Sequence, residues 1–183
     1  MGHGRPGPGT RRLPRIDSAG PSSHARRVNI YLVRHGDAVA PRADLADAHR
    51  YLSAHGRQTC RAVGRFLREL GVTFDVILTS PLMRAVQTAE LVGEGVDHVG
   101  VIESHVGLMP GAQPAVVAAD ILARSGSVAV FSHEPTVSAL AAFLLGQPSF
   151  APFMPAQVCF LESRRPVWKL RPDVLQLQDL HAH

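Results

Sequence analysis

The fold is decided by residues 28–36, which read Val28-Asn29-Ile30-Tyr31-Leu32-Val33-Arg34-His35-Gly36. Most of the first six residues are β-branched, aliphatic or aromatic, and a short run of this kind is typical of a buried strand. The run stops at two basic side chains and a glycine. We therefore expect a strand over residues 28–33, with Arg34 and His35 at its carboxyl end.

Strand and helix patterns alternate from this stretch to the end of the chain. Further strands are predicted over 75–79, 99–102 and 127–132, helices over 53–70, 81–92, 114–124 and 135–145, and two short β runs over 157–161 and 166–170. The last two runs favour a hairpin. Crossovers of this length predict the α/β class: a three-layer α/β/α sandwich with a mostly parallel sheet.

Local signals set several helix ends. Gly71 is the expected stop of the helix over 53–70. Ser80 is predicted to be the N-cap of the next helix and Pro81 its first residue, which places Arg84 in its first turn. Glu134 is interpreted as a cap at the start of the helix over 135–145, in preference to a role in orienting a substrate.

Four basic side chains are predicted to meet at one edge of the sheet, because ligands of an open α/β sheet bind beyond the carboxyl ends of its strands. Arg34 and His35 end the first strand, and His133 follows a later one. Arg84 can reach back to the same edge from its helix. Gly36 allows the backbone to turn and a ligand to approach. Two guanidiniums and two imidazoles form an oxyanion pocket, for which phosphate is a common occupant.

The charge distribution argues against a nucleic-acid partner. Residues 1–27 carry six arginines and one acid, and the remaining 156 residues carry 13 bases and 14 acids. A nucleic-acid-binding domain needs a basic face on its folded part. We expect residues 1–27 to be a disordered basic tail, either an electrostatic arm or the result of a misassigned start codon, and residues 28–183 to form a single domain.

Several other protein classes are disfavoured. No stretch reaches the roughly 18 apolar residues of a membrane-spanning helix, and the first 30 residues lack the apolar core of a secretory signal, which predicts a cytoplasmic protein without a membrane partner. Cys60 and Cys159 are too few for a disulfide framework. The histidines lack zinc-site spacing, so neither a metal nor another cofactor is predicted. Cys159 and Arg165 have the spacing of a cysteine phosphatase loop, but the segment between them contains no glycine.

Three motifs together resemble those of the histidine phosphatase superfamily, which also contains the phosphoglycerate mutases. They are Arg34-His35-Gly36, the segment over 80–89, and Ser132-His133-Glu134-Pro135. Residues 47–57 also resemble the linker of the short SixA-type phosphohistidine phosphatases. The resemblance implies a histidine phosphatase (phosphoglycerate mutase-like) fold and a phosphatase that needs no cofactor.

Carried over to this sequence, the resemblance implies that His35 is the nucleophile and becomes phosphohistidine. Arg34, Arg84 and His133 would hold the non-bridging oxygens of the phosphoryl group, with Gly36 beside them. The physical chemistry agrees, because imidazole has a pKa of about 6.5 and two neighbouring guanidiniums disfavour its charged form. Water would then attack the phosphoenzyme.

The sequence departs from the superfamily at one position. Gly107 lies where members that act on sugar phosphates use a carboxylic acid, and Glu103 or His105 could replace that acid from the same loop. A phosphorylated imidazole can leave as neutral imidazole and needs less protonation than an alkoxide. We therefore favour phosphohistidine on a protein partner as the substrate. The alternatives are a small phosphorylated metabolite, or a non-catalytic phosphate-binding module.

Overall fold

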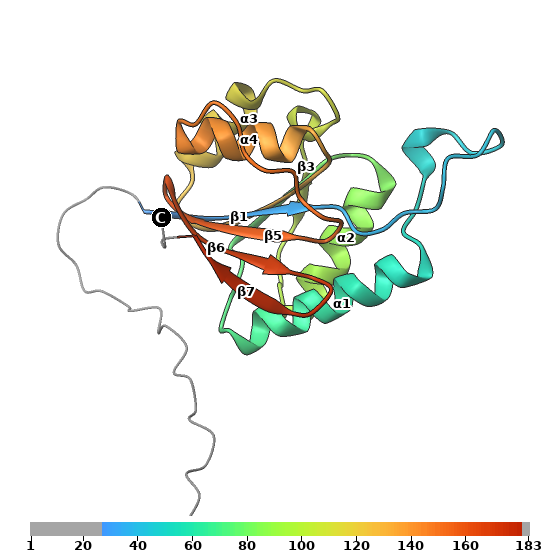
Figure 1. Cartoon of the computed structure of the whole chain (residues 1–183), viewed down its shortest axis with the longest axis horizontal. Coiled ribbons are helices and arrows are strands. Elements are labelled where there is room, and N and C mark those ends of the chain that lie inside the picture. Colours follow the sequence, from blue (N-terminus) through green and yellow to red (C-terminus); the bar gives the residue numbers. More distant parts are fainter. Residues whose placement is uncertain (1–26, 181–183) are drawn as a thin grey trace, which may run out of the picture.

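The computed structural model describes residues 27–180, so the predicted tail lies almost wholly outside the described residues. A seven-stranded sheet runs through the molecule in the order β3-β2-β4-β1-β5-β6-β7 (Figure 1). Its strands are β1 (Val28–Arg34), β2 (Val76–Thr79), β3 (Ile102–Ser104), β4 (Gly126–Ser132), β5 (Val158–Glu162), β6 (Arg165–Arg171) and β7 (Gln176–Asp179).

The sheet has a parallel half and an antiparallel half. Strands β3, β2, β4 and β1 pair in parallel, and β5 then pairs antiparallel with β1 and continues into β6 and β7. The predicted hairpin is confirmed, since β5 and β6 pair from Val158–Leu170 to Glu162–Arg165. The strand predicted over 99–102 is misplaced, because β3 begins only at Ile102 and the residues before it are exposed.

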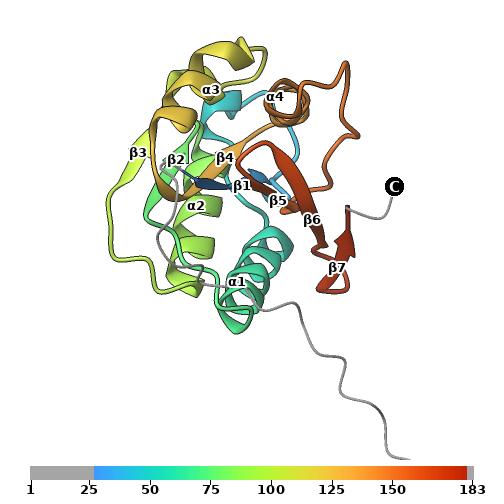
Figure 2. The same cartoon turned by 90° about the vertical axis from the view of Figure 1, so that its left-hand side faces the viewer.

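Helices cover both faces of the sheet. They are α1 (Ala54–Glu69), α2 (Met83–Gly95), α3 (Pro114–Ala123) and α4 (Thr136–Leu145), with short 3-10 helices η1 (Asp47–His49) and η2 (Val106–Leu108). Seen along the sheet in Figure 2, α1 and α2 lie on one side and α3 and α4 on the other. The predicted three-layer α/β/α sandwich is confirmed.

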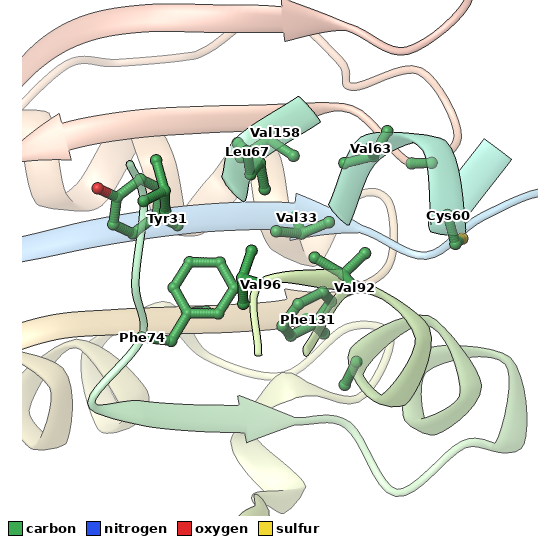
Figure 3. Packing of buried hydrophobic residues seen from close by; sticks show 14 of the residues in the cluster. Tyr31, Val33, Cys60, Val63, Leu67, Phe74, Val92, Val96, Phe131 and Val158 are labelled. Carbon is green, nitrogen blue, oxygen red and sulfur yellow. The ribbon is translucent and has the colours of Figure 1, made fainter. Parts of the chain in front are cut away.

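The core is divided in two by the central strands. Along β1, Tyr31 and Val33 belong to the cluster under α1 and α2, while Ile30 and Leu32 belong to the cluster under α3 and α4. Figure 3 shows the first cluster, where helical and sheet side chains interlock around Val33. Burial on both faces explains why β1 is a nearly continuous apolar run rather than an alternating one.

The helix ends agree with the sequence in one case and differ in another. Ser53 caps α1 by accepting a hydrogen bond from the backbone N–H of Gly56 at 2.9 Å, and Gly71 ends it with a φ of 76°. Helix α2 begins at Met83, so the predicted cap at Ser80 and first residue at Pro81 are wrong. Leu82 is the N-cap instead, and the Ser80 side chain contacts the candidate site described next.

Candidate active site

The two predicted site histidines leave neighbouring parallel strands side by side. Arg34 of β1 is paired with Ser132 of β4, and the backbone N–H of His35 donates to the Ser132 carbonyl at 2.9 Å. The next residue on each strand is therefore a histidine at the same edge. The ring centroids of His35 and His133 are 4.9 Å apart, so the structure brings these two residues together as predicted.

The tautomer of His35 is set by its own backbone neighbour. Its Nδ1 donates a hydrogen bond to the carbonyl oxygen of Gly36 at 2.7 Å, which leaves the lone pair on Nε2. Burial, followed by the positive charges of Arg84, Arg34 and Arg50, lowers the pKa of His35 to about 4, and the bond to Gly36 opposes that shift. At neutral pH, His35 is consequently an uncharged imidazole with a free Nε2.

Arg84 is buried in the first turn of α2 and is held by the loop between β1 and α1. Its Nη1 donates to the backbone carbonyl of Asp47 at 2.8 Å, and its Nη2 donates to the Asp47 carboxylate at 3.1 Å. Arg50 donates to the same carboxylate at 3.0 Å and to the carbonyl of Val39 at 2.9 Å. Asp47 thus fixes two guanidiniums whose charges both act on His35.

Arg34 is held from the opposite side by the segment before β5. Its Nη1 donates to the carbonyl of Phe153 at 2.5 Å, and the N–H of Phe153 donates to Glu134 Oε1 at 2.8 Å. The other oxygen of Glu134 accepts from the Ser138 hydroxyl at 2.7 Å. Glu134 therefore ties this segment to α4 and makes no cap at the helix start, which corrects its predicted role.

His133 is almost completely buried and contacts a serine. Its Nε2 lies 2.8 Å from Ser80 Oγ, and burial, followed by the charges of His35 and Arg84, lowers its pKa to about 3. In the described part of the chain, five buried side-chain atoms have no hydrogen-bond partner, and three of them are Arg34 Nε, Arg84 Nε and His133 Nδ1. Such unpaired buried groups are costly unless a ligand satisfies them, and guanidinium N–H groups suit an oxyanion.

A reason for glycine at position 36 that the sequence did not predict is the packing of the site against α1. The φ of Gly36 is not positive, and a Cβ at this position would lie 2.6 Å from Cys60 Sγ and 3.3 Å from the carbonyl oxygen of Gly56, both in α1. The close approach is between the end of β1 and helix α1. Its N–H donates to the Thr88 hydroxyl at 3.0 Å, which connects it to α2 as well.

Comparison with known proteins agrees with this geometry. The sequence profile of the histidine phosphatase superfamily (branch 1) matches residues 30–112. The chain is 32% identical over 121 residues to the phosphohistidine phosphatase SixA of Escherichia coli K12, of which it covers 74%. The structure of the protein histidine phosphatase SixA complexed with tungstate superposes with a TM-score of 0.73 at 30% identity, covering 82% of this chain and 99% of that one. The chain belongs to the histidine phosphatase superfamily.

Other matches cover a smaller part of the chain or share fewer identical residues with it. The mitochondrial serine/threonine-protein phosphatase Pgam5 of Drosophila grimshawi is 36% identical over 70 residues, which are 38% of this chain and 24% of Pgam5. Phosphoglycerate mutase from Bacillus anthracis has a TM-score of 0.58 at 14% identity, over 85% of this chain and 93% of that one, a likeness of fold alone. The predicted phosphoglycerate mutase-like fold is confirmed.

The sequence departs from the sugar-phosphate pattern of the superfamily at the position of the carboxylic acid, and the structure shows which nearby groups could carry a proton. Glu103 is unsuited to the role, since Arg124 binds both of its oxygens at 3.0 and 2.8 Å. His105 Nδ1 accepts from the N–H of Gly107 at 3.0 Å. Asp47 does lie at the pocket, but its hydrogen bond to Arg50, assisted by Arg84, lowers its pKa, so it carries no proton at neutral pH.

Four residues around the candidate site were not assigned to it from the sequence. Asp47 and Arg50 lie within the linker motif, which was the available signal for them. Ser80 was interpreted as a helix cap. Phe153 contacts Arg34 through its backbone carbonyl, and the identity of a side chain does not predict such a contact.

Two further findings concern the described residues 27–180. No group of three or more histidine, cysteine, aspartate or glutamate side chains in this range is placed to hold a metal ion. Within the same range, no helix has both the length and the apolar character needed to cross a bilayer.

Proposed function

We propose that the chain is a phosphatase that transfers a phosphoryl group from phosphohistidine on a protein partner to Nε2 of His35, and then to water. The observation that carries this proposal is the uncharged His35 ring with a free Nε2 beside three guanidiniums. The similarity to SixA, named a phosphohistidine phosphatase, supports the substrate, and its complex with tungstate, a tetrahedral oxyanion, supports the pocket.

In the first step, the Nε2 lone pair of His35 attacks phosphorus and the P–N bond to the substrate imidazole breaks. The ring of His35 becomes positively charged, and the carbonyl of Gly36 that accepts from Nδ1 stabilises this charge. In the second step, water attacks phosphorus, the bond to Nε2 breaks, and phosphate leaves. The second step returns His35 to the neutral tautomer, with its proton on Nδ1 facing the Gly36 carbonyl.

The other pocket side chains bind the oxygens of the transferred group. Arg34 is held by the carbonyl of Phe153 and Arg84 by the carbonyl and carboxylate of Asp47, and the Nε–H group of each is unpaired within the described residues. For His133, we assign the Ser80 hydroxyl as donor to Nε2, because this leaves Nδ1–H to donate to a phosphoryl oxygen. Donors fixed in advance around developing charge are worth about 3 kcal/mol each in the transition state.

The state of two carboxylates, Glu103 and Asp47, favours a phosphoramidate over an alkyl phosphate. Glu103 is paired with Arg124 and Asp47 is ionised, so neither offers a proton to an alkoxide. A substrate imidazole whose other ring nitrogen carries a proton departs as neutral imidazole. Both cysteines are free and buried, in keeping with the cytoplasmic location that we expect.

The test compares two substrates with the same purified protein. We expect a phosphohistidine peptide to be hydrolysed at least about a hundredfold faster than a simple alkyl phosphate. His35→Ala lowers the peptide rate at least about a hundredfold, whereas His55→Ala, at an exposed position in α1, serves as the matched control. Comparable turnover of the two substrates would contradict the assigned substrate class.

A further inference from the structure

Four half-exposed apolar side chains lie in segments that border the candidate active site, and each comes from a different part of the chain. They are Tyr51, Met83, Met109 and Met154, with exposed fractions of 37–39%, and we call them the apolar rim. Large apolar groups gathered in this way around a functional site commonly mark a surface that another molecule covers.

Each member of the apolar rim is the chain neighbour of a residue that belongs to the pocket or bonds to it. Tyr51 follows Arg50, which acts on His35 through its charge. Met83 immediately precedes Arg84 at the start of α2. These two residues lie on the α1 and α2 side of the pocket.

The other two members reach the pocket through backbone carbonyls. Met109 follows Leu108, whose carbonyl accepts from the Ser132 hydroxyl at the end of β4. Met154 follows Phe153, whose carbonyl accepts a hydrogen bond from Arg34 at the end of β1. Strands β4 and β1, which lead to the two histidines, are neighbours in the sheet. Met83 and Met109 follow β2 and β3, on one side of this pair, and Met154 precedes β5, on the other side. The segments that carry the apolar rim therefore border the two histidines from both sides along the sheet edge.

The composition of the apolar rim is unusual for this chain. The sequence contains four methionines, and apart from Met1 all of them are rim residues. A thioether side chain is flexible and polarisable, so it adapts to the shape of an apolar surface, and tyrosine is enriched at protein interfaces.

We propose that the apolar rim is the docking surface for the folded protein that carries the phosphohistidine; this inference rests on the proposed function. The charge pattern argues for this occupant. The guanidiniums of Arg34, Arg50 and Arg84 lie at the centre and the uncharged rim lies around them. The complementary partner presents a phosphoryl dianion from within an apolar patch of protein surface.

The test measures kcat/KM for two substrates, an autophosphorylated histidine kinase domain and free phosphohistidine. The triple variant Met83→Gln, Met109→Gln, Met154→Gln keeps side-chain length and removes apolar character. We expect the ratio of protein to free-substrate kcat/KM to fall about tenfold in this variant. Leu122→Gln, at a residue of α3 with a matching exposure of 38%, leaves the ratio as in the wild type.

A second measurement needs no change in the rim. Peroxide oxidation of Met83, Met109 and Met154 is followed by mass spectrometry in a His35→Ala background, where the phosphoprotein binds without turnover. We expect the phosphorylated kinase domain to slow oxidation of all three methionines at least about threefold, and free phosphohistidine to leave it unchanged.

The outcomes separate this inference from the proposed function. An unchanged substrate ratio in the triple variant, or oxidation that the kinase domain does not slow, would overturn the docking role even if phosphohistidine is hydrolysed. Failure of the wild type to hydrolyse either substrate would instead contradict the proposed function itself.

Discussion

Asp47 illustrates how one exposed carboxylate can organise a buried cationic site. It accepts hydrogen bonds from Arg84 and Arg50, and it is the only residue that joins these two side chains among the hydrogen bonds of the described residues. At an ordinary surface position such a pair contributes little, because water screens it. Here its role is positional, since the orientation of the Arg84 guanidinium decides which N–H groups face the ligand.

We predict that Asp47→Asn lowers kcat/KM for a phosphohistidine peptide about tenfold and weakens vanadate binding to a similar degree, because the charge-assisted bonds that orient both arginines are lost. The control is Asp44→Asn, which removes a comparable exposed ion pair, with Arg42, in the same loop. The free energy of unfolding changes little in either variant. Equal activity of the two variants would show that Asp47 does not position Arg84.

The sequence was informative about residues whose side chains act directly. His35, His133, Arg34 and Arg84 are brought to one edge because each follows a strand or begins a helix there, which short-range patterns predict. The contact of Phe153 could not be predicted from the sequence, because its carbonyl accepts from Arg34, which is 119 residues away in the chain. Contacts of that kind depend on the packed tertiary structure and have no local signature.

At the scale of elements, the crossing of α1 and α2 depends on two glycines. A Cβ on Gly64 would lie 2.9 Å from Gly95 Cα and 2.9 Å from the carbonyl oxygen of Val92. The helices can therefore approach closely only while both positions lack side chains. This contact sets how α2, and with it Arg84, is placed against the sheet.

We predict that Gly64→Ala destabilises the protein by about 2 kcal/mol, because backbone atoms must move apart. Helix propensity alone predicts the opposite sign, a gain of up to about 1 kcal/mol. Urea unfolding midpoints decide between them, with Arg65→Ala on the exposed face of α1 as a control expected to stay within about 0.5 kcal/mol. A stabilised Gly64→Ala protein would refute the close crossing.

Element prediction succeeded where burial is strong and failed at the edges of the sheet. Strands β1 and β4 are buried on both faces, and their apolar runs are unmistakable. Strand β7 (Gln176–Asp179) was not predicted, because it is an edge strand whose sequence is mostly polar and exposed. The strand predicted over 99–102 begins too early in the sequence. Val99 and Val101 are apolar and suggested a strand, but they are 99% and 79% exposed.

At the scale of the whole molecule, the two site histidines couple stability to pH. Burial lowers the pKa of His35 to about 4 and that of His133 to about 3, both from 6.5. Below pH 6.5 the unfolded chain therefore binds more protons than the native one. Their contribution is complete above pH 6.5 and is lost as the pH falls toward 4 and 3.

We predict that the free energy of unfolding decreases by a few kcal/mol between pH 7.5 and pH 4.5, on the order given by these shifts. The double variant His35→Asn, His133→Asn should show a much flatter profile over the same range. Denaturant titrations at four or five pH values provide the measurement. A profile of the double variant as steep as that of the wild type would place the acid sensitivity elsewhere in the molecule.

The central claim is that His35 accepts the phosphoryl group. The most direct test is to find which residue of the protein becomes phosphorylated. The protein is mixed with a radiolabelled phosphohistidine peptide, quenched in alkali to preserve phosphoramidates, digested and mapped by mass spectrometry. We predict one labelled site, at Nε2 of His35, absent from His35→Ala and present in His55→Ala. Turnover of the peptide with a label on another residue, or with label retained by His35→Ala, would contradict the account.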